Sequence, residues 1–246
     1  MREQPEQQAP PVQRLRVRYA KRGRLRFTSH RDFSRAFERA IVRARVPMAY
    51  SSGFNPHPRI SYAGASPTGA ASEAEYLEIG LATRVDPAAV LAALDEALPD
   101  GLDVLDVVES SGGSLSDLLE ASLWRTTVPG LVPSRAAQAV SDFLAAGEVL
   151  VERMTKKGMR TFDCRGAVVS MTSAARAGSD DECAILEMVL RHGTPSVRPD
   201  DVLAGLRSSA GLEAGSAPLH ERLAQGPLET QLGTVGDPLA LNRDTA

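Results

Sequence analysis

Residues 29–44, SHRDFSRAFERAIVRA, form the segment that decides the fold of the N-terminal half. Ser29 is a favourable N-cap, Asp32 suits a first helical turn, and Pro47 ends the pattern soon afterwards. Apolar side chains recur at intervals of three and four residues, as on one face of an α-helix; they are Phe33, Ala36, Phe37, Ala40, Ile41 and Ala44. We therefore expect an amphipathic helix here.

Alternating segments on both sides of this helix predict strands. Residues 14–19 place Leu15, Val17 and Tyr19 on one face and arginines on the other. The alternation resumes at residues 24–27, with Arg24 and Arg26 expected to point outward. Further elements are expected after the helix: strands at 48–50, 60–62, 77–81 and 102–108, and a second helix capped by Asp86.

The resulting order is strand, helix, strand, strand, helix, strand, which is typical of a ferredoxin-like (split βαβ) half. Residues 14–110 carry this order clearly, and residues 122–212 carry it more loosely, with a helix expected to be capped by Ser134. We predict an α+β protein with two ferredoxin-like halves, each an antiparallel sheet with its helices on one face. The remaining segments are expected to be a disordered arm, a linker and a flexible tail, at residues 1–13, 111–121 and 213–246.

Composition and missing motifs exclude several classes of protein. Hydrophobic residues make up 43% of the 246 and charged residues 24%, as in ordinary globular proteins. The sequence has no apolar run of membrane-spanning length and no secretory signal pattern, so we expect a cytoplasmic protein without a membrane partner. The only cysteines, Cys164 and Cys183, cannot hold an iron–sulfur cluster by themselves. The motifs GxxxxGK[ST], GxGxxG, GxSxG and HExxH are absent, and we expect neither metal nor cofactor.

The net charge of -3 conceals a strong segregation of charge. Residues 14–59 contain 13 lysines and arginines but two acids, whereas residues 60–120 contain 12 acids and one arginine. A ligand responds to the local field, so a basic region can attract a phosphate chain whatever the total charge. Two interpretations stay open: the arginines form a free basic surface, or they neutralise the acidic region within the fold.

Three segments carry a resemblance to a known family: Ser29-His30-Arg31-Asp32, Gly53-Phe54-Asn55-Pro56-His57-Pro58 and Ser72-Glu73-Ala74-Glu75-Tyr76-Leu77. Together they resemble the radical-SAM-linked proteins, a family of unknown function. Some of its members are fused to a radical-SAM enzyme domain, and this chain is similar to the free-standing form. It departs from the family pattern at Arg31, usually apolar, and at Gly166, often proline. The tandem architecture is also similar to that of tRNA pseudouridine synthases, but the Gly-Arg-Thr-Asp motif of those enzymes is absent.

The first functional hypothesis is an RNA-binding accessory protein that acts with an RNA-modifying or RNA-processing enzyme. The resemblance implies a radical-SAM enzyme as one such partner, a ribonuclease is another, and tRNA is one candidate RNA. Arginines would contact phosphates, and Phe54, Tyr50 or Tyr62 would stack on an unpaired base. The candidate RNA-binding residues are Arg16, Arg18, Arg24, Arg26, Arg31, Arg35, Arg39, Arg43, Phe54, Asn55, His57 and Arg59, with Arg14 beside them on the first strand.

The alternative hypothesis is an enzyme acting on tRNA or RNA. Imidazole and carboxylate groups can bind a metal or transfer protons, and the candidate catalytic residues are His30, Asp32, His57 and Glu75, with Asn55 and Glu73 beside them in the sequence. Their spacing matches no established ligand motif. Each also has a structural interpretation, as a helix cap, a loop-fixing residue or an arginine partner, so the sequence favours a non-catalytic protein.

Overall fold

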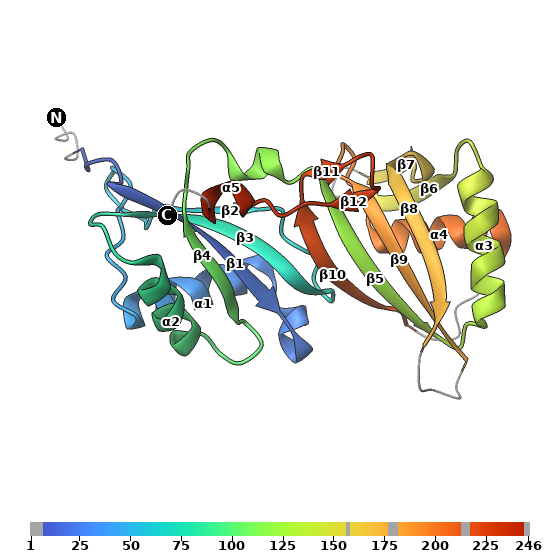
Figure 1. The fold of residues 1–246 in the computed structure, drawn as a ribbon, viewed down its shortest axis with the longest axis horizontal. Coiled ribbons are helices and arrows are strands. Elements are labelled where there is room, and N and C mark those ends of the chain that lie inside the picture. Colours follow the sequence, from blue (N-terminus) through green and yellow to red (C-terminus); the bar gives the residue numbers. More distant parts are fainter. Residues whose placement is uncertain (1–6, 156–157, 177–181, 213–216, 244–246) are drawn as a thin grey trace. The chain divides into compact units, whose positions relative to one another are not determined.

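The structure is a computed structural model that describes residues 7–155, 158–176, 182–212 and 217–243. The chain divides into two compact units (Figure 1). Unit 1 comprises Met1–Leu118 together with Pro238–Ala246, and unit 2 comprises Leu119–Asp237. Both units combine helices with antiparallel strands, which confirms the predicted α+β class. None of the described helices has both the length and the apolar character needed to cross a membrane.

Unit 1 is built on four strands and two longer helices. In the sheet, β1 lies between β4 and β3, and β2 pairs with the other edge of β3. Each of these pairs is antiparallel. The elements are β1 (Gln13–Lys21), α1 (His30–Arg43), β2 (Ile60–Ala63), β3 (Ala71–Leu81), α2 (Pro87–Ala97) and β4 (Val104–Glu109).

The predicted helix at residues 29–44 is confirmed as α1. The Ser29 side chain accepts a hydrogen bond from the backbone N–H of Asp32, which caps the first turn. Phe33 and Phe37 are buried in a core with the inward side chains of β1 and β3 and with α2; those strand residues are Leu15, Val17, Leu77, Ile79 and Leu81. Both helices therefore cover one face of the sheet (Figure 1). Residues that alternate with these core positions, such as Arg16 and Glu78, lie on the opposite face.

Two strand predictions in unit 1 are wrong. Residues 24–27 belong to a 3-10 helix, Gly23–Phe27, because β1 ends at Lys21 and Gly23 adopts a positive φ of 53° that turns the chain. Phe27, predicted to face inward, is therefore exposed. Residues 48–50 form only isolated bridges, from Met48 to Leu81 and from Tyr50 to Pro58.

In unit 2, four antiparallel strands pair in the order β10-β5-β9-β8, and β6 and β7 form a separate hairpin. The helices α3 and α4 of this unit pack against each other. The helix predicted to be capped by Ser134 begins one residue earlier, at Pro133, with Val132 as its N-cap. The elements are β5 (Ala121–Pro129), α3 (Pro133–Ala145), β6 (Leu150–Thr155), β7 (Gly158–Asp163), β8 (Val168–Ala175), β9 (Cys183–Arg191), α4 (Pro199–Ala210) and β10 (Leu219–Gly226).

The terminal and linker predictions need correction wherever the structure describes them. The expected tail at 213–246 contains regular structure, namely β10, β11 (Leu228–Glu229), β12 (Thr234–Val235) and α5 (Ala240–Arg243). The expected linker at 111–121 contains a 3-10 helix, Leu115–Leu118. In the expected arm at 1–13, Gln13 opens β1 and the N–H of Val12 donates to the carbonyl of Leu81. Residues 1–6, 213–216 and 244–246 lie outside the described residues.

The short helix α5 contacts the rest of unit 1 through a buried amide, Asn242, which is 2% exposed, and through an ion pair of Arg243 with Asp106. Oδ1 of Asn242 accepts from Nη1 of Arg16 at 3.0 Å. Its Nδ2 donates to the carbonyl of Glu109 and to Oγ of Ser111, both at 3.0 Å. A polar group buried in this way stabilises the fold only while its partners stay satisfied.

We predict that Asn242→Ala lowers the free energy of unfolding by about 1–3 kcal/mol, because it leaves buried donors and acceptors without partners. The matched control is Leu241→Ala in the same helix, where the side chain is 73% exposed and a change within about 0.5 kcal/mol is expected. Urea unfolding followed by circular dichroism measures both variants. Equal, small effects of the two substitutions would contradict the described role of Asn242.

Candidate functional site

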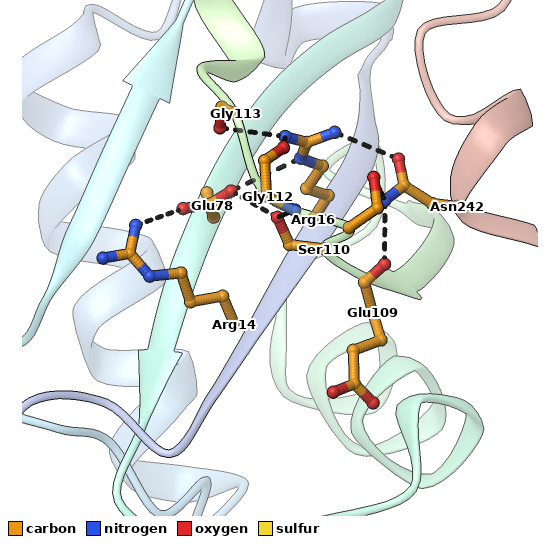
Figure 2. Close-up of polar contacts among 9 residues, drawn as sticks. Arg14, Arg16, Glu78, Glu109, Ser110, Gly112, Gly113 and Asn242 are labelled. Carbon is orange, nitrogen blue, oxygen red and sulfur yellow. Dashed lines mark hydrogen bonds and ion pairs between the residues drawn. The ribbon is translucent and has the colours of Figure 1, made fainter. Parts of the chain in front are cut away.

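Arg16, one of the candidate RNA-binding residues, is buried, and it therefore does not belong to a free basic surface. Its side chain is 1% exposed and lies on the sheet face opposite α1 and α2 (Figure 2). Nε donates to Oε2 of Glu78 at 3.3 Å, and Nη2 donates to the carbonyls of Gly112 and Gly113 at 2.6 and 3.1 Å. With the bond from Nη1 to Asn242, every guanidinium nitrogen of Arg16 has a protein partner.

The neighbouring arginines of β1 also bind acceptors within unit 1. Arg14 is exposed but donates from Nη1 to Oε1 of Glu78 at 3.1 Å. Arg18 is half-buried and donates from Nε to the carbonyl of Glu73 at 2.8 Å. Just after β1, Arg22 forms ion pairs with Glu73 and Asp103. The hydrogen bond to Glu73 is the main cause that holds the pKa of Arg22 above its usual range. Arg14, Arg16 and Arg22 therefore follow the second interpretation, neutralisation within the fold, whereas Arg18 binds a backbone carbonyl.

The arginines of α1 behave differently. Arg31, Arg35 and Arg39 are exposed, and no ion pair involves them within the described part of the chain; we call these three residues the α1 arginine face. Arg43 is exposed as well, although its Nη1 donates to the carbonyl of Ala97 at 2.9 Å. The acids of the helix are Asp32, which accepts from the Ser29 hydroxyl, and Glu38. All four helix arginines therefore lie at the exposed surface of unit 1.

The remaining predicted arginines lie in two other segments of unit 1. In the 3-10 helix, Arg24 is exposed, whereas Arg26 is half-buried with its guanidinium carbon 4.6 Å from the ring centroid of Phe27. Arg59 is half-buried just before β2. Its Nε donates to the carbonyl of Tyr50 at 3.1 Å, which orients the side chain.

The loop that precedes Arg59 presents aromatic and polar side chains to solvent. The side chain of Phe54 is 71% exposed and that of Tyr50 is 41% exposed, and Asn55 and His57 are exposed as well. Two hydrogen bonds between Ser51 and His57 join the ends of the loop. Oγ of Ser51 accepts from the N–H of His57 at 3.0 Å, and the N–H of Ser51 donates to the carbonyl of His57. The position of Phe54 leaves its ring free to stack on a flat ligand.

Tyr62, the third predicted stacking residue, is not presented in this way. Its hydroxyl is buried, and its ring packs edge-on against Phe33 and His30, with centroid distances of 6.0 and 4.8 Å. Burial also raises the pKa of Tyr62. Tyr62 therefore belongs to the packing around α1, and of the three predicted stacking residues Phe54 and Tyr50 are the exposed ones.

The predicted catalytic residues lie in different local environments. His30 is exposed at the start of α1 beside Tyr62, and Asp32 is bound to Ser29. His57 is exposed in its loop, while Glu75 is buried on β3 and accepts from the N–H of Ser66 at 3.1 Å. Among the residues that the structure describes, no group of three or more His, Cys, Asp and Glu side chains could hold a metal ion.

Two residues that matter most in unit 1 were not singled out from the sequence. In the sequence, Glu78 is one of the twelve acids of residues 60–120, and nothing distinguishes it from the others. In the structure, β1 and β3 pair so that Arg16 lies directly opposite Glu78. That opposition could have been found by aligning the alternating segments at 14–19 and 77–81. Asn242 lies in a region without apolar periodicity, and no sequence signal indicated its burial.

We predict that Glu78→Gln lowers the free energy of unfolding by about 3–5 kcal/mol, since it leaves the buried cation of Arg16 without a counter-ion. Glu78 also accepts from Arg14 and from the Ser110 hydroxyl, so three donors lose a charged acceptor. The control is Arg84→Ala, which breaks the exposed pair with Glu109 and should cost about 0–1 kcal/mol. Denaturant unfolding distinguishes the two, and a loss in Glu78→Gln no larger than the control would refute the described burial.

Comparison with known proteins places this two-unit α+β protein in a family. The family model described as "Uncharacterized protein conserved in bacteria (DUF2344)" matches residues 14–199, and the chain belongs to that family. No curated protein matches it. Among solved structures, it is similar to the crystal structure of an unknown protein from Galdieria sulphuraria at 14% identity, covering 85% of this chain and 98% of that chain. The TM-score of that comparison is 0.25, so it carries no argument here.

Proposed function

We propose that this protein binds RNA through the α1 arginine face. The single observation that carries the proposal is the exposure of Arg31, Arg35 and Arg39 on successive turns of one helix, without an ion pair in the described residues. Several acids that could have neutralised them bind arginines of β1 and its following turn; these acids are Glu73, Glu78 and Asp103. The α1 arginines therefore remain without a carboxylate partner in the described residues, although the sequence is rich in acids after residue 60.

The geometry of α1 suits a phosphate chain. Residues four apart on an α-helix advance by about 6 Å along its axis, so the arginines form a row rather than a point. Guanidinium groups bind phosphate through paired hydrogen bonds, and each contact releases counter-ions from the nucleic acid. The exposed ring of Phe54 offers a separate surface on which an unpaired base could stack.

We propose in addition that each unit is a ferredoxin-like half. Support comes from the order in which the strands pair. Unit 1 has the order β4-β1-β3-β2, and unit 2, without the β6–β7 hairpin, has the order β10-β5-β9-β8. In both, the spatial order is the last of these four strands in the chain, then the first, the third and the second. This is an architectural proposal, and it does not by itself identify a function. The family resemblance seen in the sequence further suggests an accessory role beside an RNA-modifying enzyme, with a radical-SAM enzyme as the candidate partner.

The test measures binding of a structured RNA by fluorescence anisotropy from about 50 mM salt upward. Arg35→Glu should weaken binding about tenfold and reduce the slope of log K against log salt by about one, because a phosphate contact is lost. Arg135→Glu makes the same charge change on the exposed surface of α3 and is the control.

Two results would contradict the RNA proposal. One is the absence of RNA binding by the unaltered chain at about 50 mM salt, where electrostatic binding is strong. The other is an equal effect of Arg35→Glu and Arg135→Glu, which would indicate that total charge matters and the α1 arginine face does not.

A further inference from the structure

We propose that unit 1 carries a phosphate-binding site in a hollow on the sheet face opposite α1 and α2. The hollow has a volume of about 250 Å³ and is lined by side chains of Arg14, Arg59 and Ser61, with Glu78 and Gly80 of β3. Because α1 packs on the other face, this site is distinct from the α1 arginine face. The proposal stands whether or not RNA binds to α1.

A glycine allows the hollow to form. A Cβ atom on Gly80 would lie 2.7 Å from Cγ of Pro11, closer than packed carbon atoms come, and 3.3 Å from Cβ of Arg59, which is a tight contact. The absence of a side chain at Gly80 thus lets Pro11 and Arg59 approach the strand. Their approach places Arg59 on the same hollow as Arg14, which comes from β1.

The charges around the hollow do not balance. Arg14 and Arg16 share one carboxylate, that of Glu78, and Figure 2 shows both guanidinium groups converging on it. The two oxygens of Glu78 already accept from these arginines and from Ser110, so the carboxylate is compensated. One positive charge therefore remains, and Arg59 adds a second. A compact anion is the ligand that such a surplus favours.

Donors in the hollow remain available for that anion. Arg59 uses Nε for the carbonyl of Tyr50, and Arg14 uses Nη1 for Glu78. Within the described ranges, no hydrogen bond occupies the Nη atoms of Arg59 or the hydroxyl of Ser61, which is exposed. Guanidinium groups bind phosphate in a planar, bidentate manner, and a serine hydroxyl adds a neutral donor.

The size of the hollow limits the ligand. Sites for small organic ligands commonly measure about 300–1,000 Å³, so this one suits a phosphate group with little attached to it. Two sources supply such a group: free phosphate or a mononucleotide, and a phosphate of an RNA strand. Both would present the same oxygen atoms to Arg14, Arg59 and Ser61.

The experiment titrates the full chain with inorganic phosphate, with AMP and with a short RNA in separate arms, followed by two-dimensional NMR or calorimetry. Arg59→Ala should weaken binding at least about tenfold, since it removes a charged donor. Ser61→Leu should weaken it by filling the hollow while every charge is kept. Arg84→Ala removes an arginine of unit 1 outside the hollow and should leave binding unchanged. Thermal unfolding of each variant verifies that it is folded.

Each outcome decides the proposal. Saturable binding of phosphate and AMP supports the site if Arg59→Ala and Ser61→Leu both weaken that binding. The natural ligand is then a free phosphate or a mononucleotide. Binding of RNA alone, weakened by the same two variants, supports the site with an RNA phosphate as its source. Absence of saturable binding in all three arms, or binding that these variants change no more than Arg84→Ala, overturns the proposal. Arg35→Glu tests the α1 arginine face separately, so failure of one proposal can be told from failure of the other.

Discussion

The ion pair between Arg16 and Glu78 is the interaction on which the arrangement of unit 1 depends. A buried guanidinium costs several kcal/mol unless a counter-charge and hydrogen-bond acceptors replace water. Here β3 supplies the counter-charge, the segment after β4 supplies the carbonyls of Gly112 and Gly113, and α5 supplies Asn242. One side chain thereby joins segments that lie up to 226 positions apart in the sequence. The bond to Asn242 is one of the contacts that hold the C-terminal residues in unit 1, together with the ion pair of Arg243 and Asp106.

The same pair explains how a chain with a net charge of -3 can keep a basic surface. The acids that follow β2 in the sequence are used by arginines of β1 and of the turn after it, at short range and partly out of solvent. The arginines of α1 are outside that arrangement, because the helix buries its apolar face and turns its basic face to water. Charge segregation in the sequence thus produces a sheet face on which arginines bind acids of unit 1, with a surplus left at the hollow, and a basic helix face.

The sequence predicted what depends on local periodicity and capping, and it failed where tertiary contacts decide. Helix α1 was predictable because Ser29 caps it and the Phe33–Phe37 stripe repeats at helical spacing. The burial of Arg16 was not, because alternation assigns a side chain to a face but does not say what covers that face. Helix α5 was missed because it is held by hydrogen bonds of Asn242 rather than by an apolar stripe. For the candidate site, the position of the α1 arginines on the polar face of a helix could therefore be predicted. The pairing of the β1 arginines Arg14 and Arg16 with Glu78 could not.

In unit 1, Arg14, Arg16 and Arg22 bind carboxylates, whereas Arg31, Arg35 and Arg39 are exposed without an ion pair in the described residues. Modification of the folded protein with phenylglyoxal, followed by peptide mass spectrometry, tests that division residue by residue. We expect rapid modification of Arg31, Arg35 and Arg39, and protection of Arg16 until urea unfolds the chain. Modification of Arg16 in the folded protein at the rate of Arg35 would contradict this division.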